Sequence, residues 1–238
     1  MPKVLMCWFC AIFAVLGGTS SLFALSTSAS AAVIVGVPNA GNCYPFTCND
    51  SGVSSGQSIQ YTQIYSSAAF AAPLAIGSIT FYDTLFPGPV ISGDYSISFG
   101  TTTASLGAGY PINLSNVSPF FVGHLGSAIG SSFTITGNSF SYDPSAGNLV
   151  LQVIASNQAN VPNGSGNGYF DADQTGATTT RAFLMTGHSA ASDQIGLVTG
   201  FNVSTVPLPP SLPMFGAAII GLVAFSLAGR RNPRPISN

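Results

Sequence analysis

The sequence predicts an all-β fold: a single β-sandwich ectodomain, arranged like a jelly roll, followed by one C-terminal transmembrane helix. Ser, Thr, Gly, Asn, Val, Ile, Phe and Tyr are abundant, and these residues favour strands and turns over helices. Between residues 33 and 203, short apolar or alternating runs are separated by Gly, Pro, Asn and Asp, and no helix-length amphipathic pattern is present. The helix is predicted by a long uncharged run near the C-terminus.

Individual strands follow from the spacing of apolar residues. Tyr95, Ile97 and Phe99 alternate with serines, which places the three large side chains on one face of a strand. The run 148–156 is apolar nearly throughout, as expected of a strand buried on both faces. Other strands are expected at 59–65, 79–83, 181–187 and 195–203. About seven to nine such strands fit a two-sheet sandwich, although one sequence does not give their order.

Three segments between these strands are expected to be turns or loops. Residues 133–136 and 140–142 flank Gly137-Asn138-Ser139, which predicts a hairpin turn. The segment 119–130 is expected to form a helical turn or a loop that covers a sheet edge. The Gly- and Asn-rich segment 162–168 is expected to be an exposed loop.

The charge pattern excludes one class of partner. Charged residues make up 5% of the chain, against about 25% in typical soluble domains. Residues 32–205 hold all seven Asp and one Arg, a formal net charge of −6. Nucleic-acid-binding proteins present clustered Lys and Arg side chains to phosphates, so nucleic acid is not an expected partner.

Residues 1–31 have the pattern of a secretory signal peptide. Lys3 precedes the uncharged run 4–16, and small residues follow. The run 4–16 has 13 residues, which is short for a bilayer that takes about 20 apolar residues. We therefore expect this segment to be cleaved rather than retained as an anchor. Cleavage is placed after Ala31, with Ala29 and Ala31 facing signal peptidase and Ala32 as the neighbouring choice.

Cysteine usage agrees with export. Cys7 and Cys10 lie inside the predicted signal peptide, which leaves Cys43 and Cys48 in the mature chain. In an oxidising compartment an even pair favours a disulfide. A bond between Cys43 and Cys48 would close a small loop and hold the mature N-terminal segment in place.

The sequence offers few candidates for catalysis. The histidines are His124 and His188, and Asp193 lies close to His188 in sequence, which suggests a Ser-His-Asp hydrolase. No G-x-S-x-G surrounds any serine, and a triad is defined by geometry rather than by sequence proximity. We therefore expect no enzymatic activity, no catalytic residues and no cofactor.

A cation site is weighed separately at residues 167–176. Asp171 and Asp173 form a D-x-D followed by Gly176, which resembles the beginning of a calcium-binding loop. Counted from Asp171, the position that an EF-hand fills with Glu is Ala182. A solvated turn is therefore the preferred interpretation and no metal is expected. Asn167, Asp171 and Asp173 are the weak candidates for ligands.

The C-terminal region has three parts. The prolines of 206–213 form a stiff extended spacer. Residues 212–229 contain no charge, and as a helix they would reach about 27 Å, enough for a thin bilayer. Arginines follow, and the positive-inside rule keeps them cytoplasmic. The sequence thus predicts a transmembrane helix at 212–229 and a cytoplasmic tail at 232–238.

This order of proline motif, single span and terminal arginines resembles the PEP-CTERM sorting signal. The usual Val-Pro-Glu-Pro motif is matched with Leu in place of Glu, and the Val-Pro-Leu-Pro-Ala variant is closer. The resemblance covers residues 206–231 and implies recognition by an exosortase, a membrane-embedded cysteine peptidase. The residues that carry it are Val206, Pro207, Leu208, Pro209, Pro210, Arg230 and Arg231.

A second segment, residues 140–153, resembles one that recurs in PEP-CTERM ectodomains. In that segment an aromatic-Tyr-Asp-Pro turn leads into Gly-Asn-Leu and an apolar strand. Asp143-Pro144 would start the turn and Gly147-Asn148 would end it. We interpret this segment as a structural signature and not as an active site.

Together these features predict an exported, exosortase-sorted component of the cell surface or extracellular matrix. The chain would be anchored transiently in the inner membrane through 212–229, facing the periplasm. Its expected role is non-catalytic: structural, adhesive or associated with exopolysaccharide. The expected partners are signal peptidase, an exosortase and exopolysaccharide. Two alternatives stay open: a secreted hydrolase of glycans or esters carried by His124 or His188, and a carbohydrate-binding module whose exposed aromatic rings stack on sugars.

Overall fold

The computed structural model describes residues 31–48, 58–84, 88–127, 130–159 and 168–205. Most of the signal peptide, including Ala29, and all of the C-terminal sorting signal lie outside these residues. Ala31 is described and is the first residue of a strand. The structure does not test cleavage after Ala31, which stays a prediction. No helix of the described part of the chain is long and apolar enough to cross a membrane, and the predicted span at 212–229 is not among the described residues.

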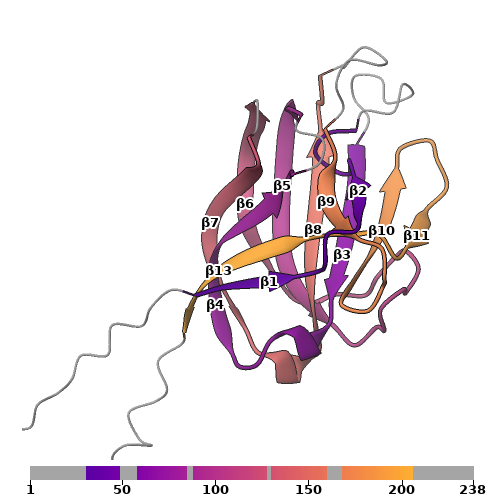
Figure 1. Ribbon diagram of the computed structural model, residues 1–238. Coiled ribbons are helices and arrows are strands. Elements are labelled where there is room, and N and C mark those ends of the chain that lie inside the picture. Colours follow the sequence, from indigo (N-terminus) through magenta and orange to yellow (C-terminus); the bar gives the residue numbers. More distant parts are fainter. Residues whose placement is uncertain (1–30, 49–57, 85–87, 128–129, 160–167, 206–238) are drawn as a thin grey trace, which may run out of the picture.

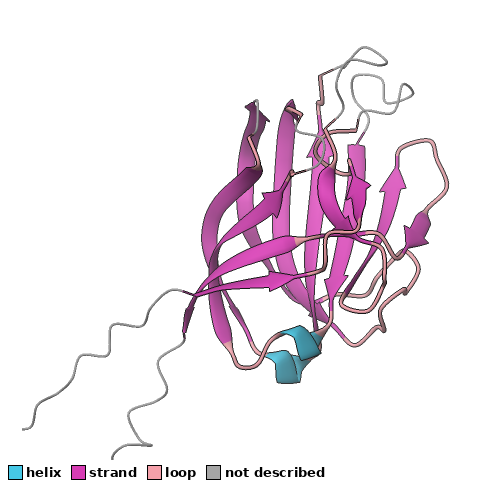
Figure 2. Cartoon of the chain, viewed as in Figure 1, coloured by secondary structure: helices cyan, strands magenta, loops and turns pink. Residues whose placement is uncertain are grey.

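The described residues form an all-β structure with two main sheets (Figures 1 and 2). The four-stranded sheet has the order β1 (Ala31–Val35), β13 (Thr199–Thr205), β4 (Leu74–Tyr82) and β7 (Ser132–Tyr142). The six-stranded sheet has the order β11 (Ala191–Asp193), β10 (Thr179–Met185), β3 (Ser58–Tyr65), β8 (Asn148–Ser156), β5 (Val90–Thr102) and β6 (Ser115–Ser127).

A third, small sheet completes the structure. Its order is β12 (Gly196–Leu197), β9 (Phe170–Asp173) and β2 (Ala40–Asn42). Hydrogen bonds from Gln63 of β3 to Leu197 and from Arg181 of β10 to Asn42 place this sheet against β3 and β10. Two 3-10 turns, η1 (Ser67–Ala69) and η2 (Pro144–Ala146), are the helical segments of the described chain.

Strand pairing is nested along the chain. β1 pairs with β13, β3 with β8, β4 with β7 and β5 with β6, all antiparallel. Each inner pair therefore lies, in sequence, between the members of the outer pairs. β10 and β11 fall between β8 and β13 and extend the six-stranded sheet beyond β3.

Aromatic side chains join the two main sheets. Phe99 of β5 stacks on Phe140 of β7 at 5.4 Å, and Tyr65 of β3 meets Phe201 of β13 edge-on at 5.0 Å between ring centroids. Burying large rings in edge and offset geometries stabilises a core beyond the area removed from water. These contacts explain why the apolar members of each alternating run face inward.

Most predicted strands are confirmed. Tyr95, Ile97 and Phe99 are all buried on one face of β5. The expected strands 59–65 and 148–156 correspond to β3 and β8. The predicted turn after Tyr142 is also confirmed. Asp143 accepts a hydrogen bond of 2.9 Å from the Ser145 amide and caps η2.

The hairpin turn predicted at Gly137-Asn138-Ser139 is wrong, because β7 runs through these residues. Thr136 pairs with Ser78 and Phe140 with Ile76, so the register shifts between them. A Cβ at Gly137 would lie 2.3 Å from the Phe120 carbonyl oxygen. The glycine thus permits close approach to β6, which is a common reason for glycine inside a strand.

The loop or helical turn predicted at 119–130 is also wrong. Residues up to Ser127 belong to β6, which pairs with β5 from Ser115 to Ser127. β6 is an edge strand of its sheet. Pro119 is accommodated there because an edge strand does not need every N–H for pairing.

Candidate functional site

His124 lies in a polar array on the six-stranded sheet. Its Nε2 is 2.9 Å from the Ser92 hydroxyl oxygen, and its Nδ1 is 3.2 Å from Oδ1 of Asp94. Asn157 donates a 2.8 Å hydrogen bond to Oδ2 of Asp94. These four side chains are called the His124 array. One of the two histidines singled out by sequence therefore has a serine and a carboxylate beside it.

The strand register builds this array. Asp94 pairs directly with His124 across β5 and β6, and with Ser156 of β8 on its other side. Between the pairs Val90–Ser127 and Gly93–Leu125, β5 has one more residue than β6. Such a bulge re-aims the side chains it contains, and here it includes Ser92.

Contacts from two distant segments hold the bulge. The amide of Ile91 donates to the Phe46 carbonyl at 2.8 Å, and the Ser92 carbonyl accepts from the Ala159 amide at 2.7 Å. On β6, Gly126 has φ +153, and a Cβ there would lie 2.6 Å from the Ser92 Cα. A larger residue at this position would separate the strands where Ser92 faces His124.

The array is open to solvent. The His124 and Asp94 side chains are 63% and 54% exposed. The hydrogen bond from Asn157 and, second, the contact with His124 lower the pKa of Asp94. The carboxylate is therefore ionised over the whole neutral range, as an acceptor for a histidine N–H requires.

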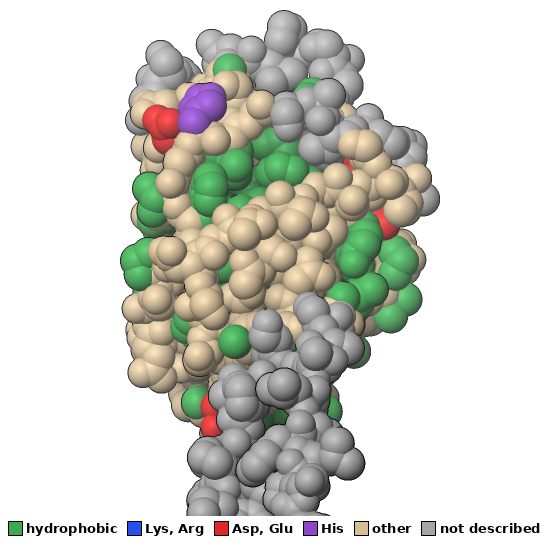
Figure 3. Space-filling model, turned by 90° about the vertical axis from the view of Figure 1, so that its left-hand side faces the viewer, with side chains coloured by type: hydrophobic (Ala, Val, Ile, Leu, Met, Phe, Trp, Pro, Cys, Tyr) green, Lys and Arg blue, Asp and Glu red, His purple; other side chains and the backbone are tan. Residues whose placement is uncertain are grey.

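Two hollows lie along β6, and the first of them adjoins the His124 array. One, of about 290 Å³, is lined by Asp94, His124, Val122 and Ile154 among others. A second, of about 320 Å³, lies between β6 and β7 and is lined by Phe120, Phe121 and Val122. Figure 3 shows a histidine next to an acidic side chain near the top of this face, above a depression with apolar side chains in it.

His188 and Asp193, which the sequence suggested as partners, have different surroundings. The His188 amide donates to the Met185 carbonyl in the turn after β10. Asp193 instead accepts two 2.8 Å hydrogen bonds from Nε and Nη2 of Arg181. The triad imagined around His188 is therefore not formed with Asp193.

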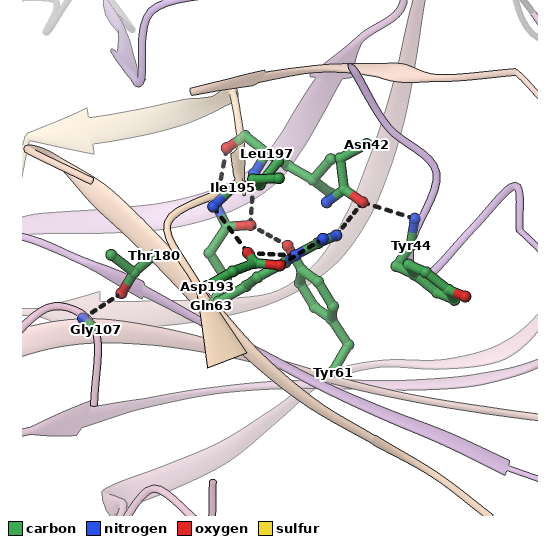
Figure 4. Close-up of polar contacts among 10 residues, drawn as sticks. Asn42, Tyr44, Tyr61, Gln63, Gly107, Thr180, Asp193, Ile195 and Leu197 are labelled. Carbon is green, nitrogen blue, oxygen red and sulfur yellow. Dashed lines mark hydrogen bonds and ion pairs between the residues drawn. The ribbon is translucent and has the colours of Figure 1, made fainter. Parts of the chain in front are cut away.

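Arg181 is the centre of a second polar cluster, drawn in Figure 4. Its side chain is 9% exposed and that of Asp193 35%. Its Nη1 donates to Oδ1 of Asn42, and the guanidinium lies 5.1 and 5.8 Å from the ring centroids of Phe183 and Tyr44. A planar guanidinium with a bidentate carboxylate and flanking rings is the usual arrangement of a buried arginine.

The neighbouring glutamine ties this cluster to the small sheet. Gln63 donates to the Leu197 carbonyl and accepts from the Leu197 amide, both at 2.8 Å, so its amide group imitates a strand pairing. It also accepts a 2.5 Å hydrogen bond from the Tyr61 hydroxyl. Burial raises the pKa of Tyr61, and the charge of Arg181 opposes this only in part. We interpret the Arg181 cluster as structural.

The predicted disulfide between Cys43 and Cys48 is confirmed, with the two Cα atoms 4.9 Å apart. It does more than secure the end of the chain. The loop that it closes carries Phe46, which packs on Phe81 at 5.1 Å and Tyr95 at 5.7 Å, between the two main sheets. The bond thus holds a buried aromatic side chain in the core.

The interpretation of Asp171 and Asp173 as a solvated turn is wrong. Both lie in β9 and are 2% and 1% exposed. Asp171 accepts from the amide and hydroxyl of Thr84, at 3.2 and 2.8 Å. Burial acts to raise the pKa of Asp173, but hydrogen bonds, chiefly from Thr175, outweigh it and lower that pKa. The pair pins neighbouring loops onto the sheet.

The described residues contain no group of three or more His, Cys, Asp or Glu side chains placed to hold a metal ion. Asn167, the third weak candidate, lies outside them. The structure brings in three residues that sequence reasoning missed: Ser92, Asp94 and Asn157. Only the β5–β6 register, which depends on the fold, could have joined them to His124.

Comparison with known proteins adds no relative. No family model matches the chain. No curated protein and no solved structure matches it either.

Proposed function

We propose that this chain is an exported component of the cell surface or extracellular matrix, delivered by an exosortase-type sorting signal. The observation that carries the proposal is the tail, in which a proline motif, an 18-residue uncharged run and arginines follow one another within residues 206–231. The proposed transmembrane helix at 212–229 would anchor the chain until the signal is processed. The role of the cargo would be structural, adhesive or associated with exopolysaccharide.

Two features of the described chain support export. The Cys43–Cys48 disulfide fits an oxidising compartment. Arg181 is the single Lys or Arg of the described residues, and it is used internally by Asp193 and Asn42. The described surface therefore offers no free Lys or Arg side chain to a polyanion, which favours neutral partners such as uncharged polysaccharide.

We further propose that the ectodomain is a jelly roll. Eight strands form four nested pairs distributed over two facing sheets, the pattern of a long antiparallel hairpin rolled into two layers.

The carbohydrate-binding alternative receives less support. Sugar stacking needs exposed aromatic rings, and among the described residues Tyr169 is the single aromatic side chain with as much as 40% of its surface exposed. Binding to polysaccharide, if observed, would then depend on hydrogen bonds from the Ser- and Thr-rich surface rather than on an aromatic platform.

Fractionation of the native host tests the sorting proposal. The wild-type chain is expected in the surface or matrix fraction. A variant with Pro207→Ala and Pro209→Ala is expected to accumulate in the membrane fraction, because the motif is lost while the uncharged run remains. Pro213→Ala, in the same spacer but outside the motif, is the matched control and should behave as wild type. An unchanged distribution of the double variant would contradict the proposal.

A second measurement tests the role of the cargo. The mature protein, incubated with cells and extracellular polysaccharide of a host strain that lacks it, is expected to remain with one of the two. Recovery of all the protein in the wash would remove the structural and adhesive roles while leaving the sorting proposal intact.

A further inference from the structure

The His124 array has the connectivity of a serine hydrolase site. A hydroxyl oxygen lies 2.9 Å from one imidazole nitrogen, and a carboxylate oxygen lies 3.2 Å from the other. This is the order nucleophile, general base and orienting carboxylate, which defines such sites by geometry and recurs on unrelated folds. The distances lie within, or at the limit of, the reach required for proton transfer.

The carboxylate is itself oriented. Oδ1 of Asp94 faces His124, while Oδ2 accepts from Asn157 at 2.8 Å. Asn157 has φ +52, a left-handed conformation that Asn adopts more readily than most residues. An ionised Asp94 can only accept, so its contact with Nδ1 requires the proton on that nitrogen and leaves Nε2 of the neutral ring to accept from Ser92.

The position of Ser92 is set by two local features of the β5–β6 pair. The register of β5 and β6 shifts at three places, and the shift between Val90 and Gly93 adds to β5 one residue in the stretch that contains Ser92. The glycine at 126 lets the two backbones approach there. Bulges are frequent beside active sites because they redirect one side chain without disturbing the rest of the sheet.

We propose that Ser92, His124 and Asp94 form an esterase site for acyl groups carried by large, neutral molecules. The class of substrate follows from the exposure of the His124 array to solvent. A site on an open sheet face does not enclose a small molecule, but it is accessible to an ester group that projects from an extended polymer. The hollow of about 290 Å³ is lined by His124, Val122 and Ile154 but not by Ser92, so the acyl chain would extend from Ser92 past His124 to reach it.

The reaction follows from the geometry. The Ser92 oxygen attacks the ester carbonyl carbon, and its proton passes to Nε2 of His124. The carbon–oxygen bond to the alcohol then breaks, and the alcohol takes that proton from His124. Water attacks the carbonyl carbon of the acyl-serine and gives one proton to His124. The bond between that carbon and the Ser92 oxygen then breaks, which releases the acid. The proton returns to the Ser92 oxygen, so an ester and water become an acid and an alcohol.

This activity goes beyond the proposed surface role and does not depend on the sorting signal. It would also overturn the expectation that the chain has no catalytic residues. General base assistance contributes about 10²–10⁴-fold in enzymes. Because water surrounds the array, we expect a smaller effect here, a loss of at least about tenfold on removal of either Ser92 or His124.

The test uses the mature protein purified from its host. The probes are p-nitrophenyl acetate, an O-acetylated neutral polysaccharide and a fluorophosphonate that labels activated serines. Ser92→Ala and His124→Ala are expected to lower hydrolysis of p-nitrophenyl acetate at least tenfold. Peptide mapping should find the fluorophosphonate on Ser92, and His124→Ala should abolish that label. His188→Ala and Ser98→Ala, on the turn after β10 and further along β5, are the controls and should match wild type.

Asp94→Asn tests the positioning role. It is expected to slow fluorophosphonate labelling while leaving the midpoint of unfolding unchanged, a combination that a merely structural residue would not give. A fall of less than tenfold in Ser92→Ala would overturn the site, even if His124→Ala lost activity, because histidine alone can attack an activated ester. Activity on the small ester without release of acetate from the polysaccharide would overturn the substrate class.

Discussion

Two aspartates of this protein hold a nitrogen base from a neighbouring strand, and their surroundings assign them different roles. Asp193 binds Arg181 between the six-stranded sheet and the small sheet, where Asn42 and two aromatic rings also contact the guanidinium. Asp94 binds His124 on the open face of the sheet, with both side chains more than half exposed. A buried pair is a structural element that is costly to break. An exposed pair adds little stability, so its geometry is available for chemistry.

The segment around the disulfide supports both the Arg181 cluster and the His124 array. Asn42, just before it, accepts from Arg181, and Tyr44 lies beside the guanidinium. The Phe46 carbonyl accepts a hydrogen bond from the amide of Ile91, the residue before Ser92. Residues 42–46 therefore hold both the Arg181 cluster and the His124 array, and a change in this short segment should affect both.

The largest effect is expected from Phe46→Ala. Removing a buried aromatic side chain from a core costs about 3–5 kcal/mol, and Phe46 contacts rings from both main sheets. Urea unfolding followed by circular dichroism measures the loss. Val122→Ala, at a position 73% exposed on β6, is the matched control and should leave the midpoint unchanged. Equal midpoints for the two variants would show that the loop is not part of the core.

The next largest loss of stability is expected from Arg181→Met. It leaves Asp193 and Asn42 without their partner, and breaking a buried pair on one side costs about 3–5 kcal/mol; the partial exposure of Asp193 favours the lower figure. Asp94→Asn makes the comparison, since it removes the charge of the exposed pair. Its unfolding midpoint should stay at the wild-type value. A larger loss in Asp94→Asn than in Arg181→Met would reverse the assignment of roles.

The double variant Cys43→Ser and Cys48→Ser tests the shared support. Opening so short a loop should lower the free energy of unfolding by about 2 kcal/mol. It should also slow fluorophosphonate labelling of Ser92, because the Phe46 carbonyl no longer holds the bulge in place. Reduced stability with an unchanged labelling rate would mean that the bulge is independent of the loop.

Two adjacent residues of β5, Asp94 and Tyr95, have pKa values shifted in opposite directions. Tyr95 faces the core, and burial raises its pKa from 10.0 to about 12. Because its folded value is above the unfolded one, its contribution to stability is complete below pH 10 and is lost as the pH rises toward 12. Urea midpoints measured from pH 9 to 12 should fall less steeply in Tyr95→Phe than in wild type. Parallel curves would contradict this.

The smallest effect concerns Asp94, on the outer face. Asn157→Gly keeps the left-handed backbone but removes the donor that contributes most to lowering the pKa of Asp94. The carboxylate should then titrate at a higher pH than in wild type, as followed by NMR of its side-chain carbon. Asn138→Gly, a substitution of the same kind on β7, should leave the titration unchanged.

The sequence predicted what depends on short-range pattern. Tyr95, Ile97 and Phe99 alternate because one face of β5 is buried, and the Cys43–Cys48 pairing had no alternative within the mature chain. The turn at Asp143 follows from local side-chain chemistry. In each case the physical cause lies within a few residues.

The errors arose where distant segments decide. Gly137 looks like a turn residue, yet it serves the approach of β7 to β6. Asp171 and Asp173 look solvated, but Thr84 and Thr175 allow them to be buried. His124 was singled out, but Asp94 and Ser92 precede it by 30 and 32 residues, and only the strand register brings them together.

The central claim is that this β-structure is the cargo of an export and sorting signal. Intact mass of the mature protein, isolated from its native host without reduction, tests it most directly. The account predicts a chain that starts at Ala32, lacks the residues beyond the proline motif at 206–210, and is lighter by two hydrogens for the Cys43–Cys48 disulfide. A mass that retains residues 1–31 and 212–238 would contradict it.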